Sequence, residues 1–244
     1  MSRLDNINEL LTEVEEISST LSDLYEQAKK DNSIPHISCA KIKSALEHLR
    51  SILDYCAMDA YLYVYGKSPR ERLYFPFAED EKYFNKRLAN KFPLLLQKNP
   101  KIYHLIASVQ PHISGSKWLL YLCHYVNKNK HHNFTSQVRK TKDSVSIGNL
   151  FKVSGGGTIT GVNSSVNGVP IGRDNSIPVV ITDTMTDAEI KGQLNPNNPY
   201  LPITRVAEDI KFFIDNSDND ALAFIQDAKQ KISQLVNELY LEIR

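Results

Sequence analysis

The chain has 244 residues, 41% of them hydrophobic and 23% charged, with a formal net charge of +1. This length is enough to bury one good core, or one core plus a small second unit. No apolar run approaches the roughly 20 residues of a membrane span, the acidic N-terminus does not resemble a secretory signal, and three cysteines without a CxxC pair favour a cytoplasmic protein with reduced thiols. P-loop, GxGxxG and GxSxG patterns are missing from the sequence, so we expect no cofactor.

Two long amphipathic helices are predicted first. Apolar residues recur at steps of three and four through residues 4–29, which is one stripe of a helix. The same spacing returns from Ser38, a good helix cap, to about Tyr65, just before Gly66. An apolar segment at 73–77 follows. Shorter helices are then predicted over 79–91 and 99–109, and the helical pattern resumes over 117–129.

The pattern changes after residue 143. Eight of the ten glycines fall between residues 148 and 192, and Asn167-Gly168 is a strong signal for a two-residue hairpin turn. Short strands are predicted at 145–147, 158–160, 166, 169–171 and 178–181. Residues 195–202 are a predicted linker, and two helices over 203–216 and 219–243 are predicted to close the chain.

The simplest fold for these elements is mainly α. It is an antiparallel helical bundle made by residues 1–142 and 203–244, with residues 143–202 as a small β-rich insertion and linker. The insertion has no chemical motif, but its charge-free hairpins suit packing on the bundle or on another chain. We predict that it forms the contact surface of a dimer or of a protein partner. The alternative is a solvent-exposed segment without a binding role.

Charge is strongly segregated along the chain. Residues 1–81 carry a net charge of −6, residues 82–142 carry +12 with no acidic side chain, and residues 143–244 carry −5. The acid-free stretch also holds five of the seven histidines. Such a stretch suits the phosphates of RNA or DNA. Neutralisation by the acidic helices of the same molecule is the alternative, and both interpretations stay open.

The densest polar cluster is Asn127-Lys-Asn-Lys-His-His132, at the end of the predicted helix 117–129. Cations there complement the helix dipole, so a solvated basic helix end is one interpretation. A histidine there is also a general acid or base for neutral pH. A metal site made by the histidines of this region is not predicted, because adjacent histidines point apart on a helix and no HExxH spacing occurs.

A second polar stripe lies on the predicted helix ending at Tyr65. Its members recur at steps of three and four and so share one face, namely Glu47, Arg50, Ser51 and Asp54. The stripe is either a solvent-facing surface with an Arg50–Asp54 pair, or the border of a cleft that faces Asn127 and His131.

Three separate elements together resemble a group of bacterial helical proteins. Residues 45–55, ALEHLRSILDY, resemble the LxxLRxxLDY helix of that group, and Phe75-Pro-Phe77 resembles its FPI element. Gln110-Pro-His112, followed by Asn127-x-x-Lys130-His131, resembles its QPY…NxxKH element. This pattern is similar to that of the HEPN superfamily, whose helical, often dimeric members occur in toxin systems, phage defence and RNA processing.

The resemblance implies an RNA-directed protein and, in catalytic members, a metal-independent ribonuclease that uses an Arg and a His. Asn127 and His131 match the Asn-x3-His part of the motif, whereas the position of the Arg is Val126. His131 is then the acid or base, Asn127 the orienting residue and Lys130 a phosphate ligand. Substrate contacts are predicted at five more residues, Arg50, Asp54, Lys128, Arg139 and Lys140.

The alternative to an RNA-directed protein belongs to a different class of function. Under this alternative the protein is a non-catalytic interaction or oligomerisation module of a bacterial complex. Asn127 and Lys130 are then structural residues that bond across the bundle. Accessibility of His131 in a basic cleft, near Arg50 or Asp54, would separate the two hypotheses.

Overall fold

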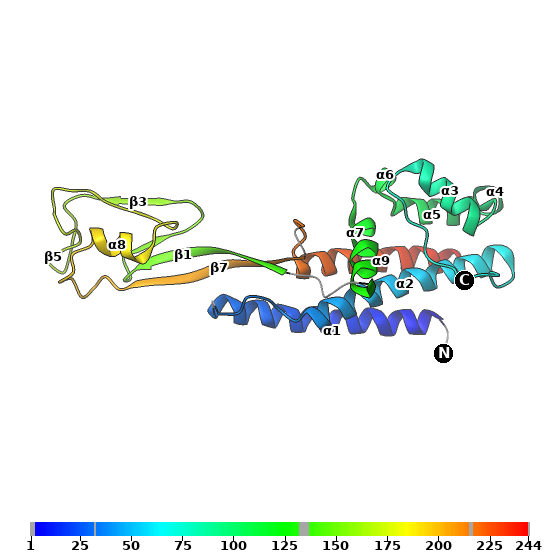
Figure 1. The fold of residues 1–244 in the computed structure, drawn as a ribbon, viewed down its shortest axis with the longest axis horizontal. Helices are drawn as coiled ribbons and strands as arrows, with labels where there is room; N and C mark the ends of the chain where they lie inside the picture. The colour runs from blue at the N-terminus through cyan, green and yellow to red at the C-terminus, as the bar shows by residue number, and fades with distance from the viewer. Residues whose placement is uncertain (1–2, 32, 132–136, 215–216, 244) are drawn as a thin grey trace. The chain divides into compact units, whose positions relative to one another are not determined.

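The computed structural model describes residues 3–31, 33–131, 137–214 and 217–243, except for the side chains of Lys130 and His131 (Figure 1). The described residues form nine helices, 54% of the chain, and small antiparallel sheets. The chain divides into two compact units. The helical unit comprises residues 1–24, 36–138 and 212–244, and the β unit comprises residues 25–35 and 139–211.

The predicted long helices are confirmed. They are α1 (Arg3–Lys30), α2 (Cys39–Tyr65), α7 (Trp118–His131) and α9 (Ala221–Glu242). Ser38 caps α2 by accepting a hydrogen bond from the Lys41 amide, and Gly66 ends it in the left-handed conformation with φ 64°. None of the described helices is long and apolar enough to cross a bilayer.

Shorter helices lie between α2 and α7 in the chain. The predicted ones are present as α3 (Glu81–Lys91) and α5 (Pro100–Ser108), and two single turns that the periodicity did not indicate are α4 (Leu95–Lys98) and α6 (Pro111–Ser114). Asp80 caps α3 through the Tyr83 amide, and Asn99 caps α5 through the Ile102 amide.

The core of the helical unit is built around α2, which packs against α7 and α9. Its apolar stripe is fully buried, with Leu46, Leu49 and Leu53 at 0% exposure. A polar contact reinforces this packing, because Asp59 of α2 bonds Arg3 of α1 and accepts a hydrogen bond from the Tyr240 hydroxyl of α9. Apolar packing therefore joins α2 to α7 and α9, and the polar contact at Asp59 joins α2 to α1 and α9.

The predicted helix over 203–216 is wrong, because Ile203–Ile214 form the strand β7. Its apolar residues recur at 203, 206, 207 and 210, a spacing that also fits a helix. In the structure, however, burial alternates as in a strand, with Ile210, Phe212 and Ile214 buried. The reason is tertiary, since β7 pairs with β1 (Gln137–Ile147), and β2 (Phe151–Val153) pairs with the other edge of β1.

Hairpins fill the rest of the β unit. The predicted Asn167-Gly168 turn is confirmed, with φ values of 49° and 79° between β4 (Ser165–Val166) and β5 (Val169–Pro170). The strand β3 (Thr158–Gly161) pairs antiparallel with β6 (Val179–Thr182). A helix that was not predicted, α8 (Asp187–Gln193), begins at a capping box formed by Thr186 and Glu189.

The β unit has an apolar core of its own. Its members come from the strands, from α8 and from the segment before β7, namely Val145, Ile147, Val153, Ile171, Val179, Ile181, Ile190, Leu194 and Leu201. Gly148 follows β1 directly and joins it to the segment before β7. Its amide donates a 2.8 Å hydrogen bond to the Pro202 carbonyl. Its φ is 52°, and a Cβ atom there would collide with the Tyr200 carbonyl oxygen.

Replacing Gly148 with alanine is therefore expected to destabilise the β unit by about 2 kcal/mol or more, as the sum of left-handed strain and the collision. Gly155 is the matched control, because it also has a positive φ, 64°, but open space around its Cβ position. Gly155→Ala is expected to cost about 1 kcal/mol. Hydrogen exchange of the β1 amides would measure both, and equal costs would contradict the assigned contact.

Candidate functional site

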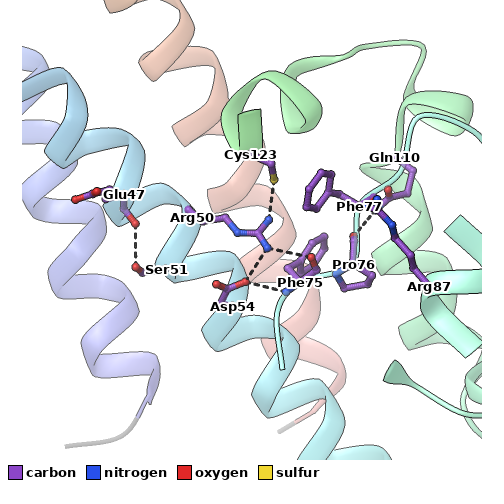
Figure 2. Close-up of polar contacts among 10 residues, drawn as sticks. All are labelled: Glu47, Arg50, Ser51, Asp54, Phe75, Pro76, Phe77, Arg87, Gln110 and Cys123. Atoms are coloured by element: carbon purple, nitrogen blue, oxygen red, sulfur yellow. Dashed lines mark hydrogen bonds and ion pairs between the residues drawn. The ribbon is translucent and has the colours of Figure 1, made fainter. Parts of the chain in front are cut away.

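The main polar network of the helical unit joins α2 to the segment Phe75–Ala78, which we call the clip (Figure 2). The Oδ1 atom of Asp54 accepts a 2.8 Å hydrogen bond from the Phe75 amide. Nη2 of Arg50 donates to the Phe75 carbonyl at 3.2 Å and lies 3.2 Å from Asp54 Oδ1. The side chains of this pair are only 11% and 22% exposed. The pair therefore holds both backbone polar groups of Phe75 and is not a solvent-facing stripe.

Arg50 also reaches α7. Its Nη1 atom donates a 2.7 Å hydrogen bond to the Sγ atom of Cys123. Burial raises the pKa of the Cys123 thiol to about 11, and the opposing effect of the Arg50 charge is smaller. The thiol is thus protonated at neutral pH and accepts the bond as a neutral sulfur. One guanidinium in this way connects α2, the clip and α7.

Gln110 fixes the other end of the clip. This side chain is fully buried, and its Nε2 atom donates to the carbonyls of Pro76 and Ile106 at 3.0 and 3.1 Å. Its Oε1 atom accepts a 3.2 Å bond from the Ala78 amide. The three sequence elements that were singled out at 45–55, 75–77 and 110–112 are therefore neighbours in space. Many of their polar side-chain atoms form hydrogen bonds with the backbone of the clip.

A groove of about 570 Å³ opens beside this network. Residues of the clip and its neighbour Tyr74 form one wall, and α2, α3 and α7 supply the others. The lining side chains are Arg50, Asp54, Tyr74, Phe75, Pro76, Phe77, Arg87, Asn90, Lys91, Val126 and Asn127. Three of them are cations and one is an anion, and the anion accepts a hydrogen bond from the backbone of Phe75. The groove is therefore positively charged and lined with aromatic rings.

Phe77 organises the cationic side of the groove. The guanidinium carbons of Arg50 and Arg87 lie 5.2 and 5.1 Å from the centre of its ring, which is cation–π distance. Arg87 also donates a hydrogen bond to the Phe77 carbonyl, as Figure 2 shows. Lys91, one turn further along α3, pairs with the exposed Glu71 at 3.4 Å.

The structure brings several of the predicted site residues together. Arg50, Asp54 and Asn127 line the same groove, and Val126 lines it with them. Two other members of the α2 stripe are not part of it, since Ser51 donates to the backbone of Glu47 along the helix.

The remaining predicted residues lie elsewhere or outside the described part. Lys128 follows Asn127 on α7 but does not line the groove, and the side chains of Lys130 and His131 are not described. Arg139 belongs to the β unit, where it donates to the carbonyls of Ala28 and Ile34 around the end of α1. Lys140 is exposed on β1.

The groove contains residues that were not predicted, namely Tyr74, Arg87, Asn90 and Lys91. The last three occur at i, i+3 and i+4 and so share one face of α3, a spacing that is visible in the sequence. Lys82 and Lys86 on the same helix are equally basic, however, so the sequence did not show which basic face meets a groove.

In comparisons with known proteins, no family model, no curated protein and no solved structure matches the chain. Within the described residues, no group of three or more His, Cys, Asp or Glu side chains is placed to hold a metal ion. The fold and site thus define a protein of mixed helical and β structure with a cationic, aromatic groove.

Proposed function

We propose that the protein binds RNA in this groove and cleaves it without a metal ion, as a HEPN-like component of a phage-defence or toxin system. The observation that carries the proposal is the composition of the groove. The cations Arg50, Arg87 and Lys91 line the groove together with the exposed ring of Tyr74, and Asp54 is the one acid among the lining residues. Cations bind phosphates and aromatic rings stack on bases, so this combination suits a nucleic acid.

His131 is the proposed acid–base residue. It is the last residue of α7 and follows Asn127 by four positions, so both occupy the same side of that helix. Asn127 lines the groove, which supports the proposal that His131 acts on a phosphate bound there. In metal-independent cleavage the 2′-hydroxyl of RNA attacks the adjacent phosphorus while the 5′-oxygen leaves. The 2′-hydroxyl loses a proton and the 5′-oxygen gains one. His131 performs one of these two transfers near neutral pH, and solvent water performs the other.

The alternative is a non-catalytic interaction or oligomerisation module, and one observation favours it. The β unit exposes several large apolar side chains, among them Val162, Ile177 and Val206 at 54%, 62% and 50%. Surfaces of this kind take part in contacts between chains. This alternative gives the groove no polyanionic ligand, so RNA binding separates the two functions.

Binding of a fluorescein-labelled 12-nucleotide RNA, followed by anisotropy, tests the proposal. Two phosphate contacts, by Arg87 and Lys91, predict a logarithmic salt slope of about −1.4, which is a loss of affinity of about 7-fold between 50 and 200 mM salt. An uncharged peptide nucleic acid of the same base sequence is the control and should bind weakly, without this slope. No RNA binding, or binding that does not respond to salt, would contradict the proposal.

A further inference from the structure

The groove face of α3 is built from three polar side chains. Arg87, Asn90 and Lys91 line the groove together, while Phe84 and Leu88 of the same helix are buried in the core. Helical spacing thus divides α3 into an apolar face and a face that presents a guanidinium, an amide and an ammonium group. All three groups donate hydrogen bonds, as a phosphate ligand requires.

Of the two arginines in the groove, Arg50 is committed to the protein. Its side chain is 11% exposed, and both of its terminal nitrogens bond groups of the helical unit, namely Cys123, Phe75 and Asp54. Moving it toward a ligand would break these bonds. Arg50 is therefore a positioning residue for the clip.

Arg87 is placed differently, because it is exposed and one of its terminal nitrogens donates to the Phe77 carbonyl. A guanidinium has five N–H donors, so this single bond fixes its orientation and leaves a pair of donors for the two oxygens of a phosphate. The Phe77 ring, 5.1 Å from the guanidinium carbon, restricts it further. A side chain held in this way loses less entropy when it binds a ligand.

We infer that Arg87 supplies the guanidinium that binds the phosphate in this groove. The inference rests on the proposed function. Val126, the residue at which the sequence resemblance would place an arginine, lines the same groove with an apolar side chain. The guanidinium thus reaches the groove from α3, with Phe77 as its support, and Lys91 adds a second charge one turn away.

Three variants of the full chain test this assignment. Arg87→Gln should weaken binding of the labelled RNA about 10-fold or more and reduce the salt slope by about 0.7, the value of one phosphate contact. Arg87→Lys keeps the charge but not the bidentate fork and should recover binding only in part. Lys86→Gln is the matched control, because it removes one charge from the adjacent, exposed position of α3 outside the groove lining. It should change affinity less than 2-fold.

A second probe, adenosine monophosphate, separates the two levels of the proposal. If the wild type binds RNA but Arg87→Gln and Lys86→Gln weaken it equally, the assignment of Arg87 is overturned and the proposed function stands. If the wild type binds the nucleotide in an Arg87-dependent way but not RNA, the assignment stands and the proposed function is overturned. Binding of neither probe overturns both. Unchanged melting temperatures would show that the variants are folded.

Discussion

Replacing His131 with alanine is expected to reduce cleavage of RNA about 100- to 10,000-fold while the affinity for RNA changes little. The size of the effect is that of a general acid or base, because the 2′-hydroxyl and the 5′-oxygen both exchange protons as the bond breaks. A quenched fluorescent RNA, assayed with an excess of chelator, measures the rate.

His104→Ala is the control for this experiment. His104 is exposed on α5 and does not line the groove, so its loss should leave cleavage unchanged. Equal cleavage by the wild type and the His131 variant would remove His131 as the catalyst. Salt-dependent binding without cleavage by the wild type would leave RNA binding in place and remove catalysis.

Replacing Arg50 with alanine is expected to lower the free energy of unfolding by about 2–4 kcal/mol, far more than the few tenths typical of an exposed helical ion pair. The truncation leaves the Phe75 carbonyl and the partly buried Asp54 carboxylate without the guanidinium. Arg50→Lys should recover little of this stability. One ammonium group does not reproduce the planar fork of Arg50, which donates to both Cys123 and Phe75.

Urea titrations followed by the fluorescence of Trp118, the single tryptophan of the chain, would measure these values in the helical unit. Arg70→Ala is the matched control, since Arg70 is exposed and should change stability by no more than about 0.5 kcal/mol. The double variant with Asp54→Ala should cost less than the sum of the single ones, because the two residues act on the same backbone groups. An Arg50 variant as stable as the Arg70 variant would contradict the network.

The long helices were predictable because their apolar stripes persist over many turns. The strand β7 was not, since the apolar spacing of Ile203, Val206 and Ile210 fits a helix equally well, and only pairing with β1 decides between the two. Local periodicity thus predicted those elements whose burial depends on one face. It failed where a partner distant in the sequence sets the conformation.

The candidate site was likewise predictable only in part from the sequence. Helical spacing was enough to place Arg50 and Asp54 on one face, and the hypothesis that this face borders a cleft with Asn127 agrees with the lining of the groove. Spacing did not show that the pair bonds the backbone of Phe75, because that contact depends on the path of the clip. Charge alone also did not distinguish Arg87, in the groove, from Arg139, which bonds carbonyls of the β unit.

Because α2 packs against α9, the two units complete their cores at different times during synthesis. Every core residue of the β unit precedes α9 in the chain, so this core is complete before the last helix has been made. The apolar stripe of α2, made early, has no α9 to cover it during that time. The helical unit therefore completes its core only once α9 has been made, and a chain that stops before Ala221 leaves the leucines and isoleucines of this stripe open to water.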